Sequence, residues 1–217
     1  MTNHWTDIGN ADVILIMGSN AAENHPISFH WVTRAMEKGA TLIHVDPRFT
    51  RTSAKANIYA PLRSGTDIAF LGGMIKYIIE DIEKNPQGYN TEYLREYTNA
   101  GWLINPNFSF SDGIFSGYDA AARSYKDKST WQYQLDDKGI PKQDKSFKDA
   151  NCVFQLLKKH YSRYTPEKVS AITGMPQDKF LEITQLFASS GKPDKSAVIL
   201  YAMGTTQHTN GTQNIRA

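Results

Sequence analysis

The feature that most constrains the fold is an unbroken run of five apolar residues, Val13 to Met17, followed directly by Gly18. Such a run between polar turn residues is typical of a strand covered on both faces, as in a parallel sheet. Gly18 lets the chain turn sharply at the carboxyl end of the strand, and Pro26 suits the first position of a helix. Ligands of open α/β sheets bind at the carboxyl ends of the strands. The polar turn between Gly18 and Pro26 is therefore the first place to look for a binding site.

The alternation of strand and helix continues along the chain. The apolar patterns predict further strands at 41–45, 58–62 and 197–201, longer helices at 26–38, 68–83 and 176–188, and shorter helical segments at 51–56, 91–98 and 153–161. Thr165 is expected to cap a helix that has Pro166 at its first position. This order predicts an α/β fold, a Rossmann-like parallel sheet flanked by helices with right-handed crossovers.

One segment breaks this pattern. From Asn99 to Ala150 the chain is rich in Gly, Ser, Asp, Phe and Tyr, and residues 131–135 followed by 136–139 are typical of one arm of a hairpin and its turn. We interpret about 99–150 as a surface insertion in a single domain that covers 1–217. Its aromatic residues are expected to form a cluster of their own rather than a cofactor site.

Composition excludes several classes of protein. The chain has 217 residues with a net charge of only +2 and no basic stripe, which argues against nucleic acid as a partner. The single cysteine, Cys152, excludes an internal disulfide and a cysteine-built metal or iron–sulfur site within this chain, and is expected to be a small buried residue. No stretch approaches the roughly 20 apolar residues of a membrane span, and the first residues lack the character of a signal peptide.

Polar residues concentrate where the predicted strands end. Four such segments follow four strands, at 18–26, 45–48, 63–67 and 202–208. In a parallel sheet all four lie along one edge, which is the arrangement of a nucleotide site.

Asp46 is the most informative single residue in these segments. An acidic residue at the end of the second strand can accept hydrogen bonds from both ribose hydroxyls of a nucleotide. The alternative is a helix N-cap in a strand-to-helix loop. The first turn contains only Gly18 of the G-x-G-x-x-G pattern, so an ordinary NAD site is disfavoured.

No catalytic group stands out from the sequence. No nucleophile lies in an evident pair with a base, and none of the six histidines has metal-ligand spacing with a carboxylate. His44 alternates within a predicted strand and is expected to be a hydrogen-bonded core or edge histidine. The residues predict a binding surface without catalytic machinery.

The four polar segments, taken in order, resemble those of a known family. The segments at 17–26, 45–52, 60–67 and 201–209 with 213–216 are similar to the large catalytic subunit of formate dehydrogenase, a molybdopterin oxidoreductase of the group that resembles dimethyl sulfoxide reductase. The similarity is greatest to the respiratory, exported branch that carries molybdenum or tungsten. Segments 112–119, 131–133 and 162–166 also resemble that branch.

The resemblance implies a bis(molybdopterin guanine dinucleotide) cofactor. The residues that match the family's cofactor loops are Ser19, Asn20, Glu23 and Asn24 in the first loop, Asp46 and Arg48 in the second, Gly65 and Asp67 in the third, and Met203, Gly204 and Gln207 beside a pterin near the metal.

The resemblance also implies that this chain is the central part of a larger subunit. In the family a 4Fe-4S cysteine motif and a selenocysteine or cysteine metal ligand precede the position of Met1, and the arginine that faces formate follows the position of Ala217. We therefore expect no formate oxidation by this chain alone. The implied partners are the rest of the catalytic subunit, an iron–sulfur electron-transfer subunit and formate, and the implied location is the periplasm.

Two other functions stay open on the residues. One is a different molybdopterin oxidoreductase, of the nitrate, thiosulfate or polysulfide type, although the insertion favours formate dehydrogenase. The other is a nucleotide-binding module without catalytic activity.

Overall fold

The computed structural model describes residues 3–217, which divide into two compact units. The first unit contains the residues up to Asn90 together with 161–217, and the second contains 91–160.

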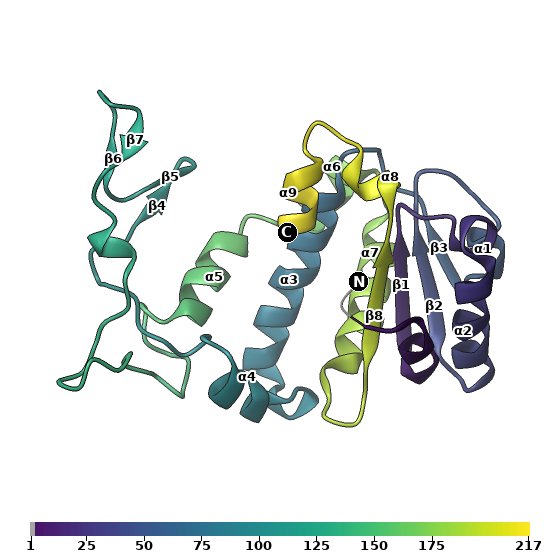
Figure 1. The fold of residues 1–217 in the computed structure, drawn as a ribbon, viewed down its shortest axis with the longest axis horizontal. Helices are drawn as coiled ribbons and strands as arrows, with labels where there is room; N and C mark the ends of the chain where they lie inside the picture. The colour runs from purple at the N-terminus through teal and green to yellow at the C-terminus, as the bar shows by residue number, and fades with distance from the viewer. Residues whose placement is uncertain (1–2) are drawn as a thin grey trace. The chain divides into compact units, whose positions relative to one another are not determined.

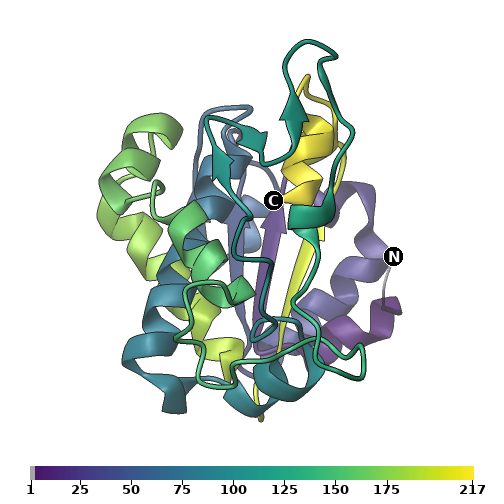
Figure 2. The same ribbon diagram turned by 90° about the vertical axis from the view of Figure 1, so that its left-hand side faces the viewer.

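A four-stranded sheet forms the centre of the first unit (Figure 1). Its strands are all parallel and lie in the order β3-β2-β1-β8, with bounds of Ile58–Ala60, Thr41–Val45, Val13–Met17 and Ala197–Tyr201. Figure 2 shows β1 beside β8, and the register pairs Val13 of β1 with Thr41 on one side and Ala197 on the other. The predicted parallel sheet is confirmed. Strand β3 ends at Ala60, just before Pro61, which has no N–H group for a further ladder bond.

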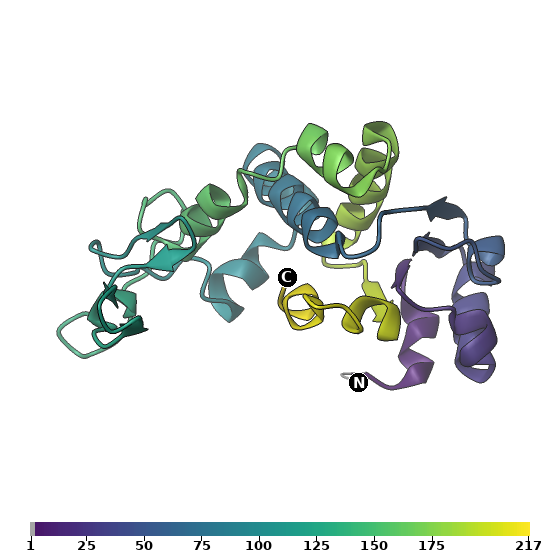
Figure 3. The same cartoon turned by 90° about the horizontal axis from the view of Figure 1, so that it is seen from above.

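Helices cover both faces of this sheet (Figure 3). On one face lie the 3₁₀ helix η1 and helix α2; on the other lie helices α3, α6 and α7. Their bounds are Trp5–Asn10, Pro26–Glu37, Asp67–Lys84, Pro166–Thr173 and Gln177–Ala188. Thr165 caps α6 as predicted, since its side chain accepts a hydrogen bond from the Lys168 N–H.

The two-sided covering explains the apolar run of β1. Val13, Leu15 and Met17 belong to the core beneath α3, α6 and α7, whereas Ile14 and Ile16 belong to the core beneath η1 and α2. All five side chains are buried. A strand with both faces buried has no polar alternation to reveal its period.

Strand β8 differs from its prediction as a buried strand. It pairs only with β1 among the residues that the structure describes, so it is an edge strand, and Ile199 and Tyr201 are 44% and 53% exposed. An apolar run does not distinguish a central strand from an edge strand, because both are rich in β-branched residues.

Short helices occupy the turns of the first unit. They are α1, η2, η3, η5, α8 and α9, with bounds of Ala21–Asn24, Ser53–Lys55, Pro86–Gly88, Ser189–Gly191, Met203–Thr206 and Gly211–Arg216. The sequence interpretation placed η2 within 51–56 but missed α1 and α8, because four residues in a polar turn give no helical periodicity.

The second unit is built mainly from turns and aromatic residues. Helices α4, η4 and α5 span Thr91–Tyr97, Ser129–Trp131 and Val153–Tyr161, and two antiparallel hairpins pair β4 with β5 and β6 with β7, at Phe110–Ser111, Ile114–Phe115, Tyr118–Asp119 and Ser124–Tyr125. The predicted turn at 136–139 is confirmed by the hydrogen bond from the Asp136 N–H to the Ile140 carbonyl, 2.9 Å. Trp131, however, ends η4 and is not part of a strand arm.

The aromatic residues of this unit form a cluster, as predicted. The ring of Phe115 lies 4.6 Å from that of Phe110 and 5.3 Å from that of Trp131, between ring centroids. Neither Trp131 nor Tyr133 belongs to the two cores of the sheet. The unit extends beyond the predicted limits of 99–150, because α4 and most of α5 belong to it. That it is an insertion in a single domain stays a prediction.

Gly73 allows α3 to approach α6 and α7 closely. A Cβ atom at this position would lie 2.6 Å from Cγ2 of Val169 and 2.7 Å from Cζ of Phe180. Gly73→Ala should therefore lower the free energy of unfolding by about 1–3 kcal/mol through overpacking. That loss should exceed the gain of about 1 kcal/mol that alanine normally has over glycine in a helix.

Urea unfolding measures this loss, with Lys168→Ala on the exposed surface of α6 as the control variant. The control should stay within about 0.5 kcal/mol of the parent chain. A Gly73→Ala chain as stable as the parent would contradict the close helix packing.

Candidate functional site

Four turns meet at the carboxyl edge of the sheet, as the parallel topology requires. Helices α1 and α8, which follow β1 and β8, lie at the same end of the sheet in Figure 1. Hydrogen bonds between the turns hold them together, and each of these bonds lies within the first unit.

The turns after β1 and β8 touch through their main chains. The Gly204 N–H donates to the Gly18 carbonyl at 3.0 Å, and Oγ1 of Thr205 lies 3.4 Å from the Met17 carbonyl oxygen. Gly18 has a φ of +55°, and a Cβ atom on it would lie 2.5 Å from the Thr205 nitrogen. Both the backbone angle and the lack of space require glycine at position 18.

The turns after β1 and β2 are joined by Thr52. Its hydroxyl donates to Oδ1 of Asn20 at 3.1 Å and accepts from the Ala22 N–H at 3.0 Å. The Asn20 amide donates to Glu23, and Glu23 lies 3.1 Å from Nε of Arg51. The ion pair of Glu23 with Arg51 is largely exposed and adds little stability.

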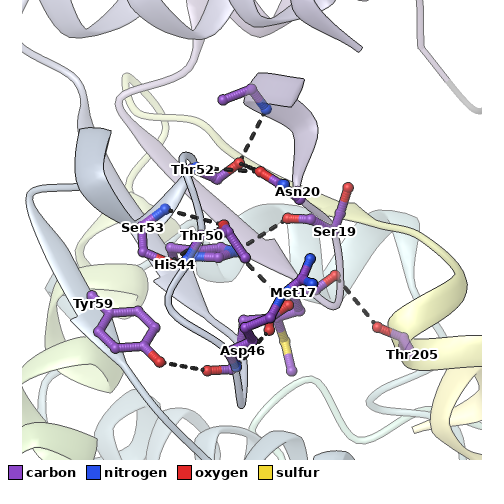
Figure 4. A network of polar contacts seen from close by, with 12 residues as sticks. Met17, Ser19, Asn20, His44, Asp46, Thr50, Thr52, Ser53, Tyr59 and Thr205 are labelled. Atoms are coloured by element: carbon purple, nitrogen blue, oxygen red, sulfur yellow. Dashed lines mark hydrogen bonds and ion pairs between the residues drawn. The ribbon is translucent and has the colours of Figure 1, made fainter. Parts of the chain in front are cut away.

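His44 lies fully buried beneath the same two turns (Figure 4). Its Nε2 is 3.1 Å from the Ser19 carbonyl oxygen, and its Nδ1 is 2.8 Å from Oγ of Ser53. Because a carbonyl only accepts, Nε2 carries the proton. Burial lowers the pKa of His44, although the nearby Asp46 charge opposes this shift, so the ring is neutral and Nδ1 accepts from the Ser53 hydroxyl. The expectation of a hydrogen-bonded core histidine is confirmed.

Asp46 lies at this edge. Within 3–217, one of its carboxylate oxygens accepts a hydrogen bond and the other accepts none. Oδ1 accepts from the Arg48 N–H at 2.9 Å. Oδ2 lies 4.0 Å from Nε2 of His44, and the side chain is 13% exposed. The next helix, η2, begins only at Ser53, so the alternative of a helix N-cap is wrong. Asp46 instead closes the tight turn that follows β2.

Asp67 begins α3 and is buried. Nδ2 of Asn214 lies 3.5 Å from its Oδ2 and donates to the Thr205 carbonyl at 2.9 Å, which links the turn after β3 to the turn after β8. Burial raises the pKa of Asp67. The Asp46 carboxylate raises it further, whereas His208 and a backbone hydrogen bond oppose the shift.

The other candidate residues make no side-chain hydrogen bond from one turn to another. The Gly65 carbonyl accepts from Nδ2 of Asn210 at 3.3 Å. Asn24 pairs with its neighbour His25. Met203 is 64% exposed, and its Sδ lies 3.4 Å from Nε2 of Gln207.

Arg48 lies in an open cavity at the outer side of the β2 turn. This cavity has a volume of about 460 Å³ and is lined by Glu23, Arg48, Phe49, Thr50, Arg51 and Ala54. Two guanidinium groups and the Glu23 carboxylate, which pairs with Arg51, line it, so its net charge is positive and suits an anion.

The sequence interpretation missed several residues that connect the turns or stabilise them internally. They are Thr50, Thr52, Ser53, Thr205, Asn210 and Asn214. The signal for the first three was the dense run of hydroxyl side chains directly after the β2 turn. The signal for the two asparagines was their spacing of four, which puts them on one face of a helix.

The described residues contain neither a metal-binding cluster of side chains nor a helix that could span a membrane. Within 3–217, no group of three or more His, Cys, Asp or Glu side chains is arranged to hold a metal ion. Over the same residues, no helix combines the length and apolar character needed to cross a membrane.

Comparison with protein families shows the class of protein to which this fold and polar edge belong. The family model "Molybdopterin oxidoreductase" matches residues 1–217, and the chain belongs to this family.

Relatives within the family include several formate dehydrogenase subunits. The chain is 56% identical over its whole length to "Formate dehydrogenase subunit alpha" of Megalodesulfovibrio gigas, of which it covers 21%. It is 53% identical, again over its whole length, to the major subunit of the nitrate-inducible formate dehydrogenase of Escherichia coli, and covers 21% of that protein. The chain thus spans about a fifth of the length of these curated relatives.

A solved structure agrees with the fold. Acetylene hydratase from Pelobacter acetylenicus matches with a TM-score of 0.58 and 22% identity, over 98% of this chain and 23% of that one. At this identity the likeness concerns the fold alone.

Gly18→Ala tests the contact between the turns after β1 and β8. Alanine in the left-handed region costs roughly 1–2 kcal/mol. Gly139 is the control, because its φ of +77° lies near that region and a Cβ atom there would meet nothing within 4 Å. Gly18→Ala should therefore lose about 1–3 kcal/mol more than Gly139→Ala in urea unfolding. Equal losses would show that the two turns do not touch as described.

Asp67→Asn tests the cost of the buried carboxylate. The pKa of Asp67 is higher in the folded chain than in the unfolded chain, where it is about 3.9. The protonated carboxyl group therefore contributes fully to stability below the pKa of the unfolded chain. This contribution is lost as the pH rises through the pKa of the folded chain. The variant should melt at a higher temperature than the parent at about pH 7.5, and the difference should close toward about pH 4.

Asp12→Asn is a control of opposite sign. Hydrogen bonds from the Lys195 side chain and the Ser196 N–H lower the pKa of Asp12, so this variant should melt below the parent at neutral pH. A lower melting temperature for Asp67→Asn at neutral pH would contradict the buried, costly carboxylate.

Proposed function

We propose that this chain is the cofactor-binding part of a larger formate dehydrogenase catalytic subunit, and that the carboxyl edge of its sheet binds a molybdopterin guanine dinucleotide. The observation that carries the proposal is Asp46. Its carboxylate is fixed at that edge by the Arg48 N–H, and within 3–217 its Oδ2 receives no hydrogen bond. An oxygen held in this way can accept from ribose hydroxyls or from the N–H groups of a guanine.

The residues at the edge suit such a group. Asp46 and Asp67 offer acceptors for hydroxyl and N–H donors, and Arg48 and Arg51 offer guanidinium groups for phosphate oxygens. The turn at Gly65 leaves its main chain open to close approach, because the nearest atom to a Cβ built there is Oδ1 of Asn210 at 3.9 Å.

When bound, a bis(molybdopterin guanine dinucleotide) with molybdenum or tungsten supplies the two-electron chemistry that oxidises formate to carbon dioxide. The residues of this chain bind and orient that group. Asp46 and Asp67 hold its polar groups at the edge, and the joined turns keep those two carboxylates in place. Met203, Gly204 and Gln207 after β8 offer contacts to a pterin.

The metal ligand and the iron–sulfur chemistry belong, in this proposal, to other parts of the subunit. A selenocysteine or cysteine there would hold the metal, a 4Fe-4S cluster in the N-terminal part would supply electron-transfer chemistry, and the electron-accepting partner would be an iron–sulfur subunit in the periplasm. Relatives that are named as formate dehydrogenase subunits and are 50–56% identical favour formate over nitrate, thiosulfate or polysulfide as the substrate.

Asp46→Asn in the full-length subunit tests the proposal. Asn keeps an oxygen that accepts from the Arg48 N–H, so the turn and the melting temperature should be preserved. The variant loses the charge that strengthens bonds from a nucleotide, which are worth about 1.5–3 kcal/mol each. Cofactor content should fall about tenfold or more, since each ~1.4 kcal/mol is a factor of ten.

Asp46→Ala is the comparison, because it loses the turn bond as well and should lower both the cofactor content and the melting temperature. Content is measured as guanosine monophosphate released by acid hydrolysis together with the bound metal. Full content in Asp46→Asn would show that Asp46 only closes a turn.

A further inference from the structure

His44 is a buried group of β2 that touches both of the turns nearest to Asp46. It is the fourth residue of β2, on the face that Ile14, Ile16 and Leu42 fill with apolar side chains. Burying an imidazole on such a face lowers stability unless both nitrogens are hydrogen-bonded. Both are bonded here, and both partners belong to turns rather than to the core.

The bonds of His44 form a continuous chain from one turn to the other. Nε2–H donates to the carbonyl of Ser19, and Nδ1 accepts from the hydroxyl of Ser53. Oγ of Ser53 in turn accepts from the Thr50 N–H at 2.7 Å. Each donor has one acceptor in this arrangement, so only one tautomer of the neutral ring satisfies the whole chain.

We propose that His44 is a positioning residue for the nucleotide site: in its neutral form it locks the turns after β1 and β2 to each other and thereby aims the open oxygen of Asp46 at the ligand. This inference rests on the proposed function. It adds a residue that touches no ligand and acts through Ser19, Ser53 and Asp46.

A protonated ring would undo this arrangement. Nδ1 would then donate to Oγ of Ser53, and the Ser53 hydroxyl would have to turn its own proton from Nδ1 toward Oγ1 of Thr50, which is 3.5 Å away and makes a weaker hydrogen bond. The positive ring would also attract Oδ2 of Asp46, 4.0 Å away, in competition with the ligand.

Two titratable groups face the ring within the described residues, Asp46 and Tyr59. The centroid of the Tyr59 ring lies 6.1 Å from that of His44, and its hydroxyl donates to the Asp46 carbonyl at 3.1 Å. Burial and the Asp46 charge keep the pKa of Tyr59 above its ordinary value, so Tyr59 stays neutral around His44. Cofactor release should therefore quicken on acidification through the protonation of His44.

Three variants of the full-length subunit separate positioning from packing. His44→Leu fills a similar space without either hydrogen bond. His44→Gln keeps an N–H that can donate to the Ser19 carbonyl and cannot take up a proton. Ser53→Ala removes the partner of Nδ1 and the acceptor of the Thr50 N–H.

Thr184→Val is the matched control. Thr184 is a fully buried polar residue of α7 whose hydroxyl donates to the Phe180 carbonyl at 2.8 Å, on the other face of the sheet. Its replacement should lower the melting temperature and leave the cofactor content unchanged.

The readout is the content of guanosine monophosphate and metal, measured beside the melting temperature, and the rate of cofactor release from about pH 7.5 down to the lowest pH at which the subunit stays folded. His44→Leu should retain about tenfold less cofactor, and Ser53→Ala should also retain less than the parent. His44→Gln should retain cofactor close to the parent level, and its release rate should not rise on acidification as that of the parent does.

Two results would overturn the inference. One is full cofactor content in His44→Leu with a melting temperature lowered as in Thr184→Val, which would make His44 a core residue only. The other is an identical pH dependence of release in the parent and in His44→Gln. If His44→Leu does not fold, full content in Ser53→Ala overturns the inference equally.

The Asp46→Asn variant separates this inference from the proposed function. Unchanged cofactor content in Asp46→Asn contradicts the nucleotide site itself. If the cofactor content is lowered in Asp46→Asn but full in Ser53→Ala and His44→Leu, only the role of His44 is contradicted.

Discussion

The whole first unit depends on the complete enclosure of β1. This strand is hydrogen-bonded along both edges, to β2 and β8, and its side chains enter two separate cores. Nothing about its position can shift without disturbing helices on both faces, because protein interiors are close-packed. The turns after β2 and β8 bond directly to the turn that leaves β1 at Gly18, and the turn after β3 is linked to them through Asn214.

The buried polar side chains at this edge of the sheet are all hydrogen-bonded. Among the described residues, no buried side-chain nitrogen or oxygen lacks a hydrogen-bond partner. His44, Thr52 and Asn214 each bridge two turns, so the edge is organised before any ligand arrives. A preorganised site loses less conformational entropy on binding than a set of independent loops.

Much of this fold could be predicted from the sequence, and the site only in part. The strands and long helices were predictable because runs such as Val13–Met17 and the glycine and proline boundaries are local signals. The positions of Asp46 and Asp67 followed from topology alone. The bridging by Thr52, Ser53 and Asn214 was not predictable, since it joins residues up to 147 positions apart, as between Asn214 and Asp67. The exposure of β8 was not predictable either. It depends on whether another strand pairs with β8, and the sequence of β8 itself does not contain that information.

The open edge of β8 has a practical consequence for anyone who isolates this chain. Within residues 3–217, one edge of β8 pairs with no strand, and Ile199 and Tyr201 of this strand are exposed. Unpaired strand edges without charged side chains recruit further strands, from another copy or from elsewhere in a longer subunit. The solubility of the isolated piece, and the concentration at which it can be handled, will be governed by five residues at this border.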